Sequence, residues 1–329
     1  MKYLSRFSLV ALVSVVSTAG LLPQCASAQA WPAQSVRIVV PYPPGTATDV
    51  LGRTLAERLQ AKWKQPVVID NKAGASEMLA ATNVATAQPD GYTLLLASEV
   101  GLETNQFLFS KLQYNPVTDF TPIVKLIEGP LVLVVRGDSR FKSMQDIAAA
   151  ARKDPGAVSY GSAGVGGSVH LTADWMSKVG GFEVKHVPYR GSSFAVQDVL
   201  AGVIDFTLTG PPTAAPLVQS GQLRALAVTS PSRMKMLPDA PTTVEAGYRD
   251  STYMFMFGLV GPARLPPSIA QKIAADVTEI LSDPAFQAKN TEPFGYVVGG
   301  GTPEDFIRFL GGDREKHKVR VKSANVKLD

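Results

Sequence analysis

The chain has 329 residues, with 32 lysines and arginines against 28 aspartates and glutamates, three histidines and one cysteine. This near balance of charge gives no reason to expect nucleic acid or an anionic membrane surface as a partner. About 300 residues are too many for one ordinary hydrophobic core, which indicates two domains.

The first 28 residues have the pattern of a secretory signal peptide. Two basic residues precede the apolar run LVALVSVVSTAGLL, and the small residues ASA end at Ala28. This is the order of a positive n-region, an apolar h-region and a cleavage site. We expect cleavage after Ala28, with Ala30 as the alternative; lipid attachment at Cys25 is disfavoured by the large neighbour Gln24. Cleavage would remove two of the 32 basic residues and the only cysteine, and would leave a soluble periplasmic protein of net charge +2.

Strand and helix patterns alternate along the rest of the chain, which predicts an α/β fold with mostly parallel sheets. Expected strands cover residues 36–40, 66–70, 92–98, 130–135, 158–164, 184–189, 203–209 and 223–230, and 252–258 is expected to be a buried crossover strand. Expected helices cover 48–63, 78–87, 169–179, 267–281 and 302–318. Two further helices should follow the capping box at Ser143–Asp146 and the loop that ends at Ser193.

One order of elements recurs four times: a strand, a short loop of small residues, and a helix. These loops lie at 43–49, 71–77, 162–168 and 190–193. Ligands of open α/β sheets bind at the carboxyl ends of strands, so two pairs of such loops can face each other across a cleft. We expect one domain from residues 29–130 and 254–329 and a second from 131–253, with extended segments crossing between them.

The loop PYPPGTATD before the first helix has two interpretations. Unpaired N–H groups and the helix dipole make a helix N-terminus an anion site, so backbone donors near Gly45 and Thr48 could hold a ligand carboxylate. Alternatively, Pro43-Pro44-Gly45 makes a simple turn and Thr48 caps the helix.

Motifs for catalysis and for cofactors are weak. No two histidines have the i, i+4 spacing of a helical zinc site, so we expect no metal and no cofactor. Ser162 lies in YGSAG, which lacks the first glycine of a nucleophile elbow. His170 is expected to be a hydrogen-bonding residue at a helix start rather than a general base. A hydrolase that uses Ser162 or Ser168 with a histidine is an alternative, although the prediction is a protein without catalytic residues.

The motifs PYPPGTATDVLGR, NKAGASEMLAA, QPDGYTLLLAS, YGSAGVGGSVHL and VPYRGSSFAVQDVLAGVIDF resemble those of Bug-type receptors of tripartite tricarboxylate transporters. This resemblance extends from about Trp31 almost to the C-terminus. It implies a two-domain periplasmic-binding-protein fold (type II-like, a Venus flytrap) that closes on a small organic acid. It also implies a membrane permease as partner and a monomeric receptor. A sensor that presents its closed form to a receptor kinase is an alternative, because it would use the same trap.

The loops and the resemblance together give the candidate ligand-binding residues. In the first domain they are Tyr42, Gly45, Thr46, Ala47, Thr48, Asp49, Ala75, Ser76, Glu77, Ser98 and Glu99. In the second domain they are Ser162, Val165, Gly166, Ser168, Arg190, Ser192, Ser193 and Asp205. For three of them a structural role is the alternative: packing at the strand end for Tyr42, positioning of its own loop for Arg190, and holding the loop network of the second domain for Asp205.

The sequence departs from the family pattern at Thr46, where the family usually has a second glycine, and at acidic residues. Glu77 replaces part of a glycine-rich pair, and we expect its side chain either to turn to solvent or to pair with a cationic or hydroxyl group of the ligand. Glu99 and Glu103 could make the pocket acidic, which would suit an amino- or hydroxyl-bearing solute. For Glu103 the alternative is a solvated helix face.

Overall fold

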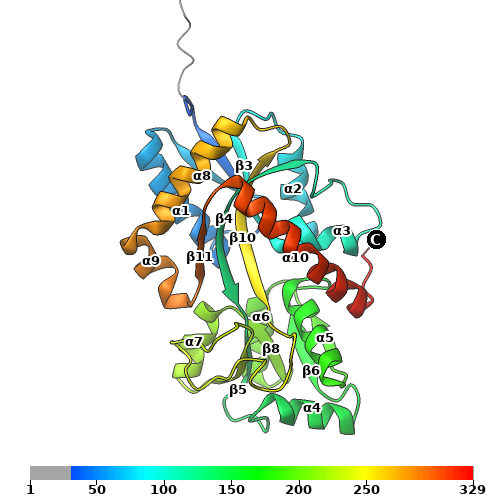
Figure 1. Cartoon of the computed structure of the whole chain (residues 1–329). Helices are drawn as coiled ribbons and strands as arrows, with labels where there is room; N and C mark the ends of the chain where they lie inside the picture. The colour runs from blue at the N-terminus through cyan, green and yellow to red at the C-terminus, as the bar shows by residue number, and fades with distance from the viewer. Residues whose placement is uncertain (1–30, 329) are drawn as a thin grey trace, which may run out of the picture. The chain divides into compact units, whose positions relative to one another are not determined.

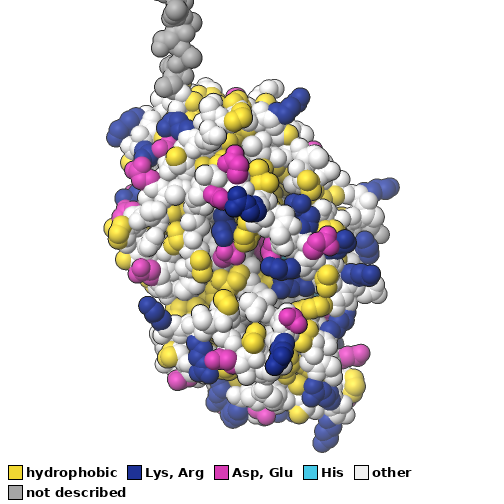
Figure 2. Space-filling model, viewed as in Figure 1, with side chains coloured by type: hydrophobic (Ala, Val, Ile, Leu, Met, Phe, Trp, Pro, Cys, Tyr) yellow, Lys and Arg dark blue, Asp and Glu magenta, His cyan; other side chains and the backbone are white. Residues whose placement is uncertain are grey.

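The computed structural model describes residues 31–328, so the expected signal peptide lies outside the described residues. From Pro32 onward the chain forms one compact unit that contains two β-sheets (Figure 1). No helix in this described part is long and apolar enough to cross a membrane. On the face shown in Figure 2, basic and acidic side chains are interspersed, as the near balance of charge suggests.

The first sheet has six strands in the order β11-β4-β10-β3-β1-β2. Its strands are β1 (Val36–Val40), β2 (Val67–Asn71), β3 (Thr93–Ser98), β4 (Phe120–Pro130), β10 (Met254–Pro262) and β11 (Val297–Gly300). The helices of this part are α1 (Ala47–Trp63), α2 (Met78–Ala85), α3 (Asn105–Leu108), α8 (Pro267–Ser282), α9 (Pro284–Asn290) and α10 (Pro303–Ala324). Side chains of α2 and α10, including Ala81 and Phe306, bury one face of the sheet against β3 and β10. Helix α1 is fastened to α8 by a hydrogen bond from Trp63 Nε1 to Asp276 Oδ2 (2.7 Å).

The second sheet has five strands in the order β7-β6-β8-β5-β9. Its strands are β5 (Val132–Arg136), β6 (Ser159–Ser162), β7 (Lys185–Pro188), β8 (Phe206–Thr209) and β9 (Leu223–Val228). The helices are α4 (Met144–Lys153), α5 (Ser168–Gly180), α6 (Ser192–Ala201) and α7 (Pro211–Gln219). Met144 of α4 and Met176 of α5 pack in one core, whereas Val196 of α6 and Ala214 of α7 pack in another. The sheet is therefore covered on both faces.

The prediction of mostly parallel sheets is wrong, because both sheets are mixed. Strand β1 is parallel to β2 and β3, but β10 is antiparallel to both of its neighbours, and β5 is antiparallel to β8 and β9. The cause is the crossing of the chain between the sheets. It leaves the first sheet through β4 and returns through β10, and these adjacent long strands run in opposite directions. The division into two domains at 130/131 and 253/254 stays a prediction.

Most expected elements are present within a few residues of their predicted ends, and the capping box of Ser143 and Asp146 starts α4 as predicted. Several short elements were not predicted. Two of them position the candidate site: the 3-10 turn η1 (Ala75–Glu77) and the π-helical turn η2 (Val100–Thr104). A π-helical turn is rare and occurs frequently at functional sites.

Candidate functional site

The loop between β1 and α1 is closed by Thr46. Its Oγ1 accepts a hydrogen bond from the amide of Asp49 (3.4 Å) and donates one to the carbonyl of Pro43 (2.9 Å). The expectation that Thr48 caps the helix is therefore wrong. Thr46 has the extended backbone of an N-cap residue, whereas Thr48 already lies inside α1.

Asp49 holds this loop in place from the first turn of α1. Its carboxylate accepts hydrogen bonds from the amide of Gly45 (2.9 Å), from Arg53 Nε (2.9 Å) and from Asn71 Nδ2 (2.8 Å). Asp49 is 2% exposed, and burial alone would raise the pKa of its carboxyl; the donors of Arg53, Gly45 and Asn71 outweigh burial and lower the pKa. Asp49 thus fixes the loop, and the Gly45 amide is already used by the protein.

Two amides remain available at this end of α1. The N–H groups of Ala47 and Thr48 have no hydrogen-bond partner within the described part of the chain. They lie at the positive end of the helix dipole, in a loop that Asp49 keeps rigid. This is the arrangement with which a helix N-terminus binds a carboxylate through its backbone.

The second loop has an unusual backbone. Gly74, Ala75, Ser76 and Glu77 have φ values of 131, 47, 49 and 73°, so three consecutive residues with a Cβ adopt positive φ. Each such residue is disfavoured by about 1–2 kcal/mol in the left-handed region, and strain of this kind clusters at ligand-binding loops. The carbonyl of Ser76 accepts a hydrogen bond from Asn105 Nδ2 (2.7 Å), which helps to hold the turn.

Glu77 faces protein donors, and the expectation of a solvent-facing side chain is wrong. The residue is 6% exposed, and its Oε1 accepts hydrogen bonds from the Tyr42 hydroxyl and from Ser98 Oγ (2.5 Å). Burial raises the pKa of Glu77 to about 7, despite these two donors. The structure therefore brings Tyr42, Glu77 and Ser98 together in one hydrogen-bonded group, with Tyr42 also packed edge-on against Phe257.

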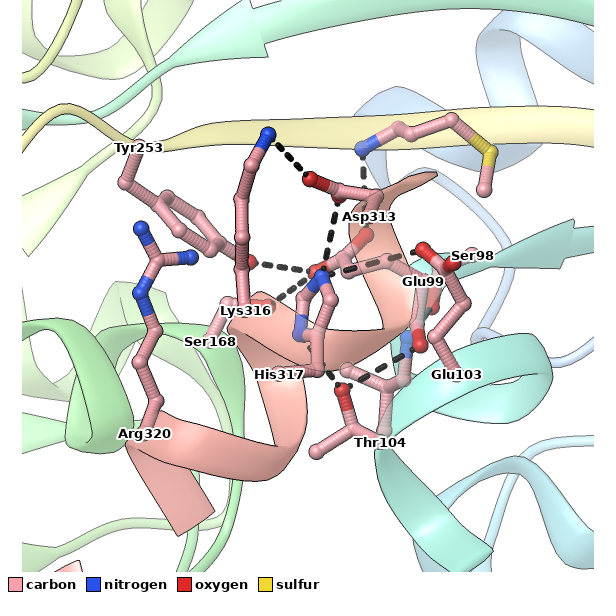
Figure 3. Close-up of polar contacts among 12 residues, drawn as sticks. Ser98, Glu99, Glu103, Thr104, Ser168, Tyr253, Asp313, Lys316, His317 and Arg320 are labelled. Carbon is pink, nitrogen blue, oxygen red and sulfur yellow. Dashed lines mark hydrogen bonds and ion pairs between the residues drawn. The ribbon is translucent and has the colours of Figure 1, made fainter. Parts of the chain in front are cut away.

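Glu99 joins the two sheets (Figure 3). Its Oε1 accepts hydrogen bonds from Ser168 Oγ (2.5 Å), at the start of α5, and from the Tyr253 hydroxyl (2.6 Å), while Oε2 accepts one from the Met256 amide (3.1 Å). Glu99 as a whole is 2% exposed. Glu103, one turn further along η2, is fully buried, so the expectation of a solvated helix face is wrong.

The glycine-rich loop after β6 is held by its own polar groups. Ser162 Oγ lies 2.6 Å from His186 Nε2 and accepts a hydrogen bond from the Gly164 amide (3.1 Å). The Gly166 amide donates to His170 Nδ1 (2.9 Å), so the prediction that His170 is a hydrogen-bonding residue at the start of a helix is confirmed. Ser162 and His186 have the spacing of a nucleophile and its base, but Ser162 is 1% exposed.

The remaining candidates of the second sheet are divided between its two ends. Val165 and Arg190 are exposed in the loops that follow β6 and β7, and Ser192 and Ser193 are exposed in the first turn of α6. Arg190 makes no hydrogen bond or ion pair with any described residue. Asp205 accepts hydrogen bonds from Ser159 N (2.8 Å) and Oγ (3.1 Å) at the amino end of β6. The structure therefore does not bring Asp205 to this group, because it lies at the opposite end of the strand.

Sequence reasoning missed several residues that build the site. Asn71, Tyr253 and His186 hold Asp49, Glu99 and Ser162 respectively, yet each is separated from its partner by 22 or more positions. For Asn71 a signal existed, because it ends a strand beside the first loop. For the other two no local pattern could have indicated the contact.

Two mixed α/β sheets with helices, connected by β4 and β10, form the fold of the periplasmic solute-binding proteins to which this chain is similar. Residues 51–326 match the family described as the tripartite tricarboxylate transporter family receptor. The chain belongs to this family, as the resemblance of its motifs implied. The family is one of periplasmic solute-binding receptors, and the fold is the one that these receptors share.

Three similar proteins show the extent of the likeness. Protein BugT of Bordetella pertussis is 31% identical over 326 residues, which are 97% of this chain and 98% of BugT. The structure of Rpa4515 from R. palustris with adipate is 31% identical with a TM-score of 0.84, covering 90% of this chain and 99% of that one. The structure of MatC from Rhodopseudomonas palustris with bound malate is 27% identical with a TM-score of 0.79, covering 88% and 99%.

Proposed function

We propose that this protein captures a small organic acid in the periplasm by closure of two domains and delivers it to the permease of a tripartite transporter. The observation that carries the proposal is the pair of unpartnered amides of Ala47 and Thr48 at the N-terminus of α1. A carboxylate placed there would receive two backbone hydrogen bonds and the favourable end of the helix dipole. Asp49 keeps this donor pair in position, so little entropy is lost on binding.

The alternative of an amino- or hydroxyl-bearing solute in an acidic pocket depends on Glu77 and Glu99 being free to contact it. Both carboxylates instead accept hydrogen bonds from protein side chains, Glu77 from Tyr42 and Ser98, and Glu99 from Ser168 and Tyr253. Because burial raises the pKa of Glu77 to about 7, this carboxyl is partly neutral near neutral pH and repels an acidic ligand less. These contacts favour an acid over a cation.

A second anionic group of the ligand would be held by the second sheet. Arg190 is exposed beside Ser192 and Ser193 and has no partner within the described part of the chain. Because adipate and malate, the ligands in the two similar structures, are both dicarboxylates, we infer a dicarboxylate with one carboxylate at α1 and the other near Arg190. We expect a monomer without catalytic activity, in which the buried Ser162 has a structural role.

The test is a thermal-shift panel on the processed protein, covering dicarboxylates, tricarboxylates, monoacids, amino acids and amide analogues. A ligand that binds only the folded state raises its stability by about 2.7 kcal/mol at a hundredfold excess over Kd. We expect a shift with a dicarboxylate that is lost in its diamide. A shift in melting temperature with amines alone would contradict the proposal that the ligand is an acid. Hydrolysis of esters that disappears in Ser162→Ala would contradict the proposal that the protein is a receptor without catalytic activity.

The variant Arg190→Gln tests the second contact. It should weaken binding of the dicarboxylate by about tenfold or more and leave the matching monoacid unaffected, because a hydrogen bond to a charged group contributes about 1.5–3 kcal/mol. Arg249→Gln, at another exposed arginine without a described partner, is the matched control. If the two variants bind the dicarboxylate with equal affinity, Arg190 does not contact the ligand.

A further inference from the structure

Side chains of η2 and α10, which are far apart in the sequence, meet beside Glu99 (Figure 3). Glu103 comes from η2, and Asp313 and His317 lie one turn apart on α10. His317 Nε2 lies 3.2 Å from Asp313 Oδ2 and 3.7 Å from Glu103 Oε2, and one ligand atom from each residue falls within 4.8 Å of the others. Glu103 is fully buried, His317 is 2% exposed and Asp313 is partly buried.

The hydrogen bond of His317 Nδ1 determines which ring nitrogen has a lone pair for a metal ion. Nδ1 lies 3.0 Å from Thr104 Oγ1, and the Thr104 hydroxyl donates its only hydrogen to the carbonyl of Glu99 (3.2 Å). Thr104 must therefore accept from Nδ1–H, so in the neutral ring Nε2 carries the lone pair. A histidine that ligates a metal has this arrangement, in which its other nitrogen donates to a fixed oxygen.

Glu103 is a buried carboxylate without a hydrogen-bond donor in the described part of the chain. Neither of its oxygens has a hydrogen-bond partner in the described part of the chain, although Oε2 is directed at His317. A buried carboxylate without a partner is costly, and a bound cation would remove this cost. One oxygen from each of two carboxyl groups and an imidazole nitrogen thus converge in one place.

We propose that Glu103, Asp313 and His317 bind a divalent transition-metal ion of the zinc class. Zinc takes imidazole nitrogen and carboxylate oxygen at about 2.0–2.2 Å in a tetrahedron, which places neighbouring ligand atoms roughly 3.3 Å apart. The distances of 3.2 and 3.7 Å from His317 Nε2 agree with two such edges. A water molecule would be the fourth ligand.

The surroundings leave these ligand atoms available. Lys316 Nζ, which is exposed, pairs with Asp313 Oδ1 (2.9 Å), and the Oδ2 atom faces His317. The expectation of no zinc centre came from the spacing of the histidines. A site with one histidine and a glutamate more than 200 positions away gives no such spacing.

The ion would connect α10 to the turn that carries Glu99. Thr104 bonds both His317 and the Glu99 backbone, and the Glu99 side chain holds Ser168 of α5. Occupation of the site would therefore stabilise the segment that joins the two sheets. This inference does not depend on the proposed ligand.

The test uses the untagged, processed protein after treatment with a chelator. We expect one equivalent of Zn²⁺ to bind by titration calorimetry, and Co²⁺ to give the visible absorption bands of a tetrahedral site. Glu103→Gln and His317→Gln should each weaken Zn²⁺ binding by at least about tenfold, since removal of even an outer-shell partner costs about 10–100-fold. Zn²⁺ should also raise the melting temperature of the wild type and not of these variants.

The control is the double variant His170→Gln/His186→Gln, which removes the other two of the three histidines. It should bind Zn²⁺ as the wild type does. No uptake of Zn²⁺ or Co²⁺ by the wild type would overturn the proposal, and so would binding that is lost in the control but kept in His317→Gln. If a Gln variant does not fold, the stoichiometry and the Co²⁺ spectrum of the wild type and the control decide the question.

Discussion

The hydroxyl of Ser168 donates a hydrogen bond of 2.5 Å to Glu99 Oε1, and this contact connects helix α5 of the second sheet to the end of β3 in the first. A protein carboxylate thus lies at the N-terminus of a helix, where an anionic ligand could otherwise bind. Leu171, one turn along α5, packs with Leu108 and Val321 and adds an apolar contact beside it.

Ser168→Ala should loosen this connection. The hydroxyl bonds a buried carboxylate, and hydrogen bonds to charged groups contribute about 1.5–3 kcal/mol, so we expect the free energy of unfolding to fall by about that amount. The ligand-free protein should also become more extended in small-angle X-ray scattering. Ser193→Ala, at an exposed serine without a described partner, is the control and should change neither quantity. Equal unfolding curves for the two variants would contradict the role of Ser168.

Asp49→Asn should release the first loop. The asparagine amide would place its own donor among the donors of Gly45, Arg53 and Asn71, and we expect a loss of about 1.5–3 kcal/mol in urea unfolding with weaker binding of the organic acid. Asp70→Asn is the control, because Asp70 makes partly exposed ion pairs, which contribute about 0–1 kcal/mol. A variant that loses stability yet binds the acid unchanged would show that Asp49 does not position the donors.

Ser76→Gly should stabilise the second loop. Ser76 has φ of 49°, a region in which glycine avoids a cost of about 1–2 kcal/mol. The greater freedom of glycine in the unfolded chain offsets part of this gain. We expect a net increase of up to about 1 kcal/mol in the free energy of unfolding, whereas Ser76→Ala should give none. A destabilised Ser76→Gly variant would mean that the serine side chain holds the turn.

Glu77→Gln should change how stability depends on pH. The pKa of Glu77 is about 7 in the folded protein, above its ordinary value of 4.5, so the folded state retains a proton that the unfolded state loses. Its contribution is full below pH 4.5 and is lost as the pH rises through about 7, because the unfolded state then binds fewer protons than the native state.

The measurement for Glu77 is urea unfolding at pH 5 and pH 7.5 in the presence of a chelator. Between these two pH values the wild type should lose on the order of 2 kcal/mol more than Glu77→Gln. Glu103 contributes in the same direction in both proteins, because burial raises its pKa to about 9, and therefore cancels in the comparison. Glu57→Gln, at an exposed position of α1, should behave as the wild type. Identical slopes for Glu77→Gln and the wild type would contradict the raised pKa.

Local patterns in the sequence predicted the elements that depend on local forces. The apolar run VRIVV and the capping box of Ser143 and Asp146 lie where they were expected, and so do the four loops between a strand and a helix. The direction of β10 was not predicted, because a strand pattern has the same period in either direction. Family membership also followed from short motifs.

The environment of the acidic residues was decided by the tertiary structure alone. Glu77, Glu99 and Glu103 are alike in the sequence, yet the first accepts bonds from Tyr42 and Ser98, the second joins two sheets and the third faces His317. A hydrogen bond depends on a fit of about 3 Å between groups that the chain may bring from any distance along its length. Short motifs therefore indicated the family of this protein. Only the tertiary packing around η1 and η2 determined which of the three carboxylates accept hydrogen bonds and which one has no hydrogen-bond partner among the described residues.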